Sequence, residues 1–244
     1  MSPEEAARAF DETHTEPEPG PTAKRKVKIS AAARSVRVIG DPTVTEASVD
    51  GRHRAHHTSG TLHIDGTVKP NEDHGFSFDG PAGWHRQWQH WRQFTEPLVV
   101  RVHPAAALDI ELSAGSLSVQ DVTGPLTVVL AAGSARLDDV SGPLNIETRA
   151  GALRISGRID ADESRIRCEA GSVSLHLSEG SSVRIRAHAE LGRVRVAGLG
   201  PTDSVFGASR QFTVGSGNGA LDIDTTMGSI EIFSRELVVA GERS

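Results

Sequence analysis

The sequence predicts an all-β protein built from stacked repeats, a β-solenoid with coils of about 18 residues. Three observations support this fold class. The hexapeptide that begins at Asp121 recurs at Asp139, glycines recur at every ninth position between 115 and 151, and apolar and polar residues alternate after many of these glycines. Aromatic residues make up only 4% of the chain. The core must therefore be filled by Val, Ile, Leu and Ala, which suits thin, regular layers.

The repeated unit consists of a corner and a short alternating segment. The corner Asp121-Val-Thr-Gly-Pro-Leu126 recurs as Asp139-Val-Ser-Gly-Pro-Leu144, and Gly115-Ser-Leu-Ser-Val119 recurs as Gly133–Leu137 and Gly151–Ile155. Strict alternation over five residues is typical of a strand with one buried face. A unit of this size cannot bury its apolar face alone, so its copies have to stack. An antiparallel sandwich of short hairpins is the competing fold.

Further segments have the same form, with apolar residues at their third and fifth positions. They are residues 60–64, 164–168, 171–175, 181–185, 192–196, 219–223 and 228–232. Glycine before a strand is expected to supply the backbone freedom that a tight corner needs. Pro125 and Pro143 stand at strand starts, where a missing N–H is tolerated.

The N-terminal segment, residues 1–23, does not follow the repeat. It carries one basic residue, Arg8, against six acidic ones, which are Glu4, Glu5, Asp11, Glu12, Glu16 and Glu18. This composition is typical of a disordered acidic tail. Alternatively, the capping-box start Ser2-Pro3-Glu4-Glu5 would allow a short helix that forms on a partner. The repeat domain is expected to span residues 24–241.

A second break in the repeat, residues 69–97, contains all three tryptophans. Trp84, Trp88 and Trp91 follow helical spacing, and Phe94 lies close to the same stripe. We expect a short helical insertion here. It would cover an end or a flank of the solenoid, present a partner-binding face, or lie at a membrane interface.

The run Leu108-Asp-Ile-Glu-Leu-Ser-Ala-Gly-Ser-Leu-Ser-Val119, followed by the Gly-Pro-Leu corners, resembles the bacterial "putative adhesin" family of β-strand repeats. The resemblance extends over residues 27–240, apart from the insertion. This family is a domain of unknown function, so the resemblance implies a repeat scaffold and transfers no catalytic residue and no cofactor.

Composition also sets limits on location and chemistry. The single cysteine, Cys168, allows no intramolecular disulfide and occupies an inward position, so we expect a buried, inert thiol. No apolar run approaches the ~20 residues that span a bilayer, and the N-terminus lacks the pattern of a secretory signal. A cytoplasmic location is therefore expected. The net charge of −6 does not favour general nucleic-acid binding.

No pattern for a metal site or an enzyme is found. His53, His56 and His57 lie in a polar stretch beside arginines, so we expect solvated side chains and not a zinc site. No nucleophile elbow and no phosphate loop precede a helix. We therefore predict no catalytic residues, no metal and no cofactor. An enzyme that cleaves polysaccharide, which would need a groove lined by carboxylates, is kept as a third alternative.

One charged pattern points to a surface. Eight arginines alternate with inward aliphatic residues and are expected to point outward: Arg136, Arg154, Arg165, Arg167, Arg184, Arg186, Arg193 and Arg195. Stacking in chain order would place Arg136 over Arg154, and Arg165/Arg167 near Arg184/Arg186. Like charges opposite each other on neighbouring strands destabilise a sheet. An anionic partner would relieve this repulsion, and so would acidic residues on nearby loops.

The sequence thus predicts a non-catalytic scaffold or interaction protein that presents a rigid repeat surface to a protein or anionic partner. Specific nucleic-acid binding is not expected, whereas peripheral membrane contact stays open. A self-assembling filament subunit is the alternative function. Charged residues at the chain ends, Lys24-Arg25-Lys26 and Gly241-Glu-Arg-Ser244, favour a closed rod over a filament.

Overall fold

The computed structural model describes residues 26–67, 96–160, 163–198, 206–234 and 237–238, and all regular structure in these ranges is β. The predicted acidic tail and the predicted tryptophan helix lie outside the described residues, so the helical insertion is not confirmed. Within the described ranges no helix is long and apolar enough to cross a membrane.

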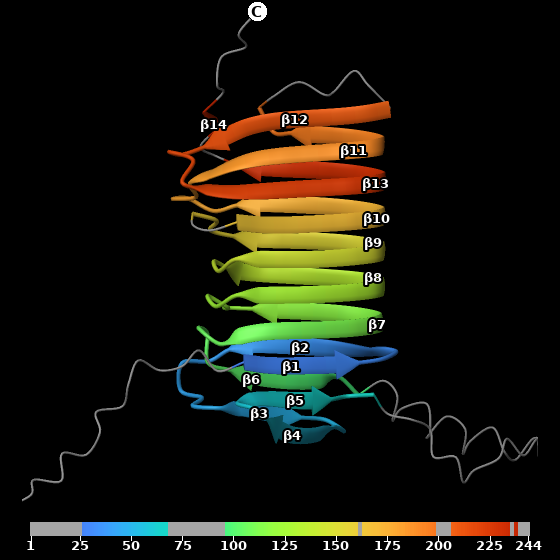
Figure 1. Cartoon of the computed structure of the whole chain (residues 1–244), viewed down its shortest axis with the longest axis vertical. Helices are drawn as coiled ribbons and strands as arrows, with labels where there is room; N and C mark the ends of the chain where they lie inside the picture. The colour runs from blue at the N-terminus through green and yellow to red at the C-terminus, as the bar shows by residue number, and fades with distance from the viewer. Residues whose placement is uncertain (1–25, 68–95, 161–162, 199–205, 235–236, 239–244) are drawn as a thin grey trace, which may run out of the picture.

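Fourteen strands of the described residues form one mixed sheet (Figure 1). They are β1 (Lys26–Ala31), β2 (Arg34–Gly40), β3 (Ala47–Asp50), β4 (Arg54–Thr58), β5 (Thr61–Asp65), β6 (Leu98–Val102), β7 (Ala107–Gln120), β8 (Leu126–Val140), β9 (Leu144–Gly157), β10 (Glu163–Leu177), β11 (Val183–Val196), β12 (Phe206–Val214), β13 (Gly219–Ser234) and β14 (Leu237–Val238).

Each long strand is folded over at a central bend. In β7, Leu108, Ile110 and Leu112 are buried before the bend, and Leu117 and Val119 are buried after it. The buried positions change from even to odd numbers, so the two halves of the strand face each other across one core. We call the half before the bend the first arm and the half after it the second arm. Every long strand therefore contributes to both layers of a flat stack.

The bend requires glycine. Gly115, Gly133 and Gly151 lie directly over one another in register and have φ between +129° and +144°. A Cβ on Gly133 would lie 1.9 Å from the carbonyl oxygen of Gly115. The same column continues through Gly171, Gly228 and Gly192. Successive bends therefore approach each other through backbone atoms alone.

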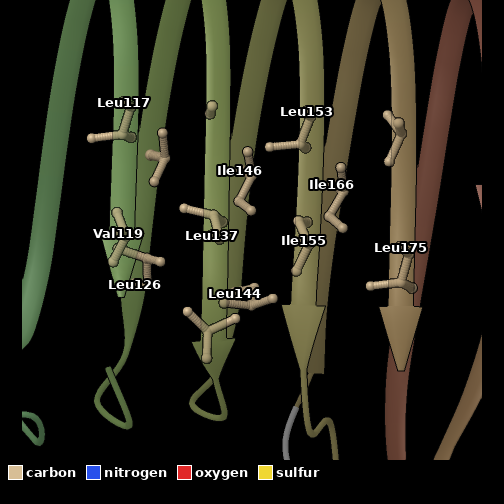
Figure 2. Close-up of a cluster of buried hydrophobic side chains, with 14 of the residues drawn as sticks. Leu117, Val119, Leu126, Leu137, Leu144, Ile146, Leu153, Ile155, Ile166 and Leu175 are labelled. Carbon is tan, nitrogen blue, oxygen red and sulfur yellow. The ribbon is translucent and has the colours of Figure 1, made fainter. Parts of the chain in front are cut away.

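Aliphatic side chains from both arms fill the space between the layers. Figure 2 shows Leu117, Leu137 and Leu153 on second arms, and Leu126 and Ile146 on the first arms behind them. The side chains of both sets lie in the space between the two layers. All five are at most 2% exposed. These ladders confirm the alternation predicted from the sequence, and they bury apolar surface at every layer.

The corners differ from the prediction in one respect. The left-handed residue of each corner is an aspartate, Asp121 with φ 58° and Asp139 with φ 54°, because Asp tolerates this conformation better than most residues. Gly124 meets a different requirement. A Cβ at this position would lie 2.2 Å from the carbonyl oxygen of Ala106 in the neighbouring corner. Glycine is thus needed here for close approach and not for its φ range.

The long strands are parallel but do not all stack in chain order. Leu108, Leu126 and Leu144 lie in register on β7, β8 and β9, so these three strands follow the predicted repeat. Beyond β10, however, β13 is inserted between β10 and β11, and it pairs in parallel with both. β12 then pairs with the far side of β11 in the antiparallel direction. Residues 215–218 form the connection that leads into β13.

The beginning of the described chain is also internal to the stack. β1 and β2 together form one coil of the stack. This coil pairs with the two arms of β7 on one side and with β5 and β6 on the other. Beyond these, β4 and β3 pair antiparallel with β5 and β6. Because Lys26 lies in β1, inside the stack, the argument from charged chain ends was wrong. Antiparallel strands lie at both ends of the stack instead (Figure 1).

Arg34, at the start of β2, is a buried charge that the sequence analysis missed. It is 7% exposed, and its guanidinium donates to the carbonyl oxygens of Arg52 at 2.7 Å, Glu96 at 2.7 Å and Gly66 at 3.3 Å. Burial lowers the pKa of Arg34 from its ordinary value, and the charge of Glu96 partly offsets this effect. One side chain thus holds together three segments at this end of the stack.

Candidate interaction surface

The two layers present two outer faces with different charge patterns. The first-arm face carries cations and carboxylates in nearly equal numbers on the described strands. The cations are Lys26, Lys28, Arg54, Arg149, Arg165, Arg167, Arg184 and Arg186, and the carboxylates are Asp65, Asp109, Glu111, Glu147, Glu163, Glu169, Glu190, Asp222 and Asp224. This face is thus largely neutralised by the protein itself.

Ion pairs across neighbouring strands connect these groups. Lys28 Nζ lies 2.6 Å from Glu111 Oε1, and this hydrogen bond raises the pKa of Lys28. Lys26 lies 3.5 Å from Asp109, and Arg167 lies 3.9 Å from Glu147. All these pairs are partly exposed, so each contributes little stability. Arg54, Arg149, Arg165 and Arg184 form no ion pair within the described ranges, but the carboxylates of this face balance its total positive charge.

The inserted strand β13 overturns one predicted arginine ladder. Asp222 lies in register between Arg165 and Arg186, and its carboxylate is 3.9 Å from the Arg186 guanidinium. Asp224 occupies the same place between Arg167 and His188. The prediction that Arg165/Arg167 stack near Arg184/Arg186 was therefore wrong, because it assumed that strands stack in chain order.

The second-arm face is more basic and rich in hydroxyl groups. Its outward positions on the described strands hold six arginines (Arg37, Arg101, Arg136, Arg154, Arg193, Arg195), four carboxylates (Asp50, Asp138, Asp139, Glu231) and nine serines (Ser35, Ser48, Ser116, Ser118, Ser134, Ser156, Ser172, Ser174, Ser229). We call this set the Arg/Ser face.

At the centre of the Arg/Ser face, Arg136 lies directly opposite Arg154 in register. Arg136 Nε is paired with Asp138 at 2.6 Å. Arg154 is exposed and forms no ion pair within the described part of the chain, and the same holds for Arg37 and Arg193. Arg37 donates instead to the amide oxygen of Gln120 at 2.9 Å. The face thus offers guanidinium and hydroxyl donors to an anion.

The eight predicted arginines are divided between the two faces. Arg136, Arg154, Arg193 and Arg195 belong to the Arg/Ser face, whereas Arg165, Arg167, Arg184 and Arg186 belong to the first-arm face. All eight are exposed, as expected.

Sequence reasoning missed two members of the Arg/Ser face, Arg37 and Arg101. A signal for both was present in the sequence, because Arg37 alternates with Val36 and Val38, and Arg101 lies between two buried valines. The same alternation that identified the other arginines would have identified these two.

A groove of about 670 Å³ crosses the first-arm face near the bend. Glu111, Glu147, Glu169 and Glu190 line it together with Arg149 and Arg167. All four glutamates are exposed to solvent, whereas a glycosidase acid needs an environment that raises its pKa. The groove therefore supplies the carboxylates that the polysaccharide alternative requires, but not the burial that would activate one as an acid.

The histidines of β4 and β5 form a small stack. The rings of His56 and His63 lie 4.9 Å apart with an interplanar angle of 11°, and His63 is in register with Lys28. His53 Nδ1 lies 2.8 Å from the carbonyl oxygen of Gly51. No group of three or more His, Cys, Asp or Glu side chains gathers as a metal site within the described ranges.

Cys168 is buried, as predicted, at 2% exposure. It lies in the core between Thr148 and Thr225, and the Thr225 hydroxyl donates to the Cys168 carbonyl oxygen at 3.0 Å. Burial is the main cause that raises the pKa of the thiol above its ordinary 9.0. The thiolate, which is the reactive form, is thus disfavoured in the folded protein.

We expect Cys168 to react with a disulfide reagent at least about a hundredfold more slowly in the folded protein than in urea. Because folding favours the neutral thiol, its contribution to stability is fully present below pH 9.0 and is lost as the pH rises through the raised pKa. The rate of thiol modification, measured with and without urea, checks this expectation. Equal rates would contradict it.

Comparison with known proteins assigns no family. No protein-family model and no curated protein matches the chain. A crystal structure of a "putative cell adhesion protein" from Clostridium sporogenes is similar over 87% of this chain and 94% of its own, with 13% sequence identity and a TM-score of 0.42. A likeness at this level carries no argument about function. The resemblance to adhesin-type repeats therefore stays an expectation.

Proposed function

We propose that this protein is a non-catalytic β-solenoid scaffold whose Arg/Ser face binds an acidic polypeptide partner. The observation that supports this most directly is the pairing of Arg136 with Arg154 in register, where Arg154 has no ion-pair partner in the described part of the chain. Guanidinium groups bind carboxylates in a bidentate fork. Serine hydroxyls on adjacent strands supply further donors.

The contrast between the two faces supports this choice of surface. On the first-arm face, carboxylates stand in register with or next to the arginines, so an incoming anion would meet carboxylates of the protein itself. On the Arg/Ser face, arginines outnumber carboxylates six to four within the described strands. A rigid sheet holds these side chains in a regular array, which reduces the entropy lost on binding.

Other partners and roles are less well supported. The Arg/Ser face carries nine serines and few large apolar side chains, of which Phe233 is one at 40% exposure, whereas a membrane-inserting surface would be mainly apolar. Phe233 stacks on His176 with the ring centroids 4.5 Å apart, but a single pair does not make the series of aromatic side chains that binds single-stranded nucleic acid. The filament alternative would need open parallel edges. β3 and β4 cover one end of the stack, and β12 covers the first arm of β11 at the other end, so among the described strands the second arm of β11 keeps an edge without a paired strand. A cytoplasmic location and the lack of enzymatic activity remain parts of this proposal.

We expect the full chain to bind labelled poly-glutamate at low salt. The double variant Arg136→Ser/Arg154→Ser should weaken this binding roughly five- to thirtyfold, since each exposed guanidinium–carboxylate contact contributes about 0.5–1 kcal/mol. Added salt should weaken binding to the natural protein because the charges are exposed. Fluorescence anisotropy of the labelled polymer measures both effects.

The matched control is Arg165→Ser/Arg167→Ser, which removes the same charge from the first-arm face. It should leave poly-glutamate affinity within about twofold of the natural value. Equal losses in the two variants would show that only net charge matters and would contradict a specific face. Binding to anionic vesicles without binding to poly-glutamate would replace the polypeptide partner with a membrane surface.

A further inference from the structure

The acidic N-terminal segment is complementary in charge to the Arg/Ser face. Residues 1–22 carry six carboxylates and one arginine. The Arg/Ser face carries six arginines and four carboxylates on the described strands. The first-arm face, where carboxylates are as numerous as cations, offers no comparable complement. Electrostatic complementarity therefore selects one of the two faces for this segment.

The topology brings this segment to the edge of that face. First arms begin and second arms end at the same edge of the stack, because each corner, such as residues 121–125, connects a second arm to the next first arm. The chain enters β1 at Lys26 on this edge, in the coil that also contains Arg37 of β2. Residues 1–22 thus need only pass around the edge to reach the ends of the second arms.

Length also permits the contact. A segment of this length, residues 1–22, reaches about 70 Å when extended. Arg154 on β9 lies three strands along the stack from β2, with β7 and β8 between them. This is about 14 Å at ~4.8 Å per strand. The two layers of a folded sheet are separated by about 10 Å. The segment therefore has more than enough chain to lie across Arg37, Arg136 and Arg154.

We propose that residues 1–22 fold back onto the Arg/Ser face and occupy it until an acidic partner displaces them. This inference rests on the proposed function, because it makes the segment an intramolecular competitor for the same site. A tethered competitor acts at a high effective concentration even when its intrinsic affinity is low. The segment would then raise the partner concentration that is needed for binding. Acidic partners of low affinity would be kept off the surface, and partners of high affinity would still bind.

The test keeps the chain at full length and removes only the charges of the segment. The neutral-tail variant carries Glu4→Gln, Glu5→Gln, Asp11→Asn, Glu12→Gln, Glu16→Gln and Glu18→Gln. We expect it to bind poly-glutamate about two- to tenfold more tightly than the natural chain. This gain should disappear when Arg136→Ser/Arg154→Ser is added, and it should persist when Arg165→Ser/Arg167→Ser is added. A gain that is the same in both backgrounds would overturn the proposal.

A second measurement separates this inference from the proposed function. A labelled peptide of residues 1–22 should bind the neutral-tail variant, and Arg136→Ser/Arg154→Ser should reduce that binding. Poly-glutamate binding with no peptide binding and no effect of the neutral tail would overturn the inference and leave the proposed function standing. Peptide binding at this face, with no binding of poly-glutamate to any variant, would support the inference and overturn the acidic-partner function.

Discussion

Replacing Gly151 by alanine is expected to destabilise the protein by about 2–5 kcal/mol, of which about 1–2 kcal/mol is strain and the rest overpacking. Gly151 has φ +144°, and an added Cβ would lie 1.7 Å from the carbonyl oxygen of Gly133 on the neighbouring strand. Neither group can move aside, because both belong to backbone that is paired on two sides. Urea unfolding followed by circular dichroism measures the change in the free energy of unfolding.

Gly60 offers a matched control for this substitution. It also has a positive φ, +77°, but no atom lies within 4 Å of the position that a Cβ would occupy. Gly60→Ala should therefore show only the conformational strain of about 1–2 kcal/mol. If the two alanine variants were equally stable, close approach at the bend would not be the reason for glycine there.

Replacing Arg34 by alanine is expected to destabilise the protein by about 3–5 kcal/mol, the range for removing one partner of a buried charged network. The substitution leaves the carbonyl oxygens of Arg52, Gly66 and Glu96 without their hydrogen-bond donor. Gly66 and Glu96 border the segment between β5 and β6. We expect hydrogen exchange to accelerate most in β5 and β6, and less in β8 and β9, which lie several layers away.

Arg37→Ala is the control, since Arg37 belongs to the same strand but is exposed, and its guanidinium donates to the side chain of Gln120 and not to backbone carbonyls of separate segments. It should change the free energy of unfolding by no more than about 0.5 kcal/mol. Arg34→Lys should restore only part of the stability that Arg34→Ala loses, because an ammonium group cannot reach three carbonyl oxygens in the planar geometry of a guanidinium. Equal stability of the Arg34→Ala and Arg37→Ala variants would contradict a clamping role.

The periodic core was predictable because it depends on local pattern alone. Alternation in Gly115–Val119 and its copies indicated which side chains are buried, and Leu117, Val119, Leu137 and Ile155 are all fully buried in the structure. The burial of Cys168 followed from the same rule. Outward arginines were found for the converse reason, since a residue between two inward aliphatics must point to solvent in a strand.

The composition of each face could not be predicted, because it depends on which strands are neighbours. Chain order suggested that β11 follows β10, whereas β13 is inserted between them and places Asp222 between Arg165 and Arg186. The bend glycines align equally well in either order, so local sequence does not discriminate between the two arrangements. Charge does discriminate, because stacking in chain order would bring the two arginines together, and like charges on neighbouring strands repel.

The sequence by itself therefore determined the strand period, the glycine-dependent bends and the identity of the core, all of which arise from contacts within one layer or between identical layers. The tertiary structure alone decided the order of the layers, the burial of Arg34 and the division of eight arginines between two faces. The physical reason is that these features depend on pairing between segments far apart in the chain, such as β10 with β13, where Cys168 lies in register with Thr225. No local periodicity encodes such a pairing.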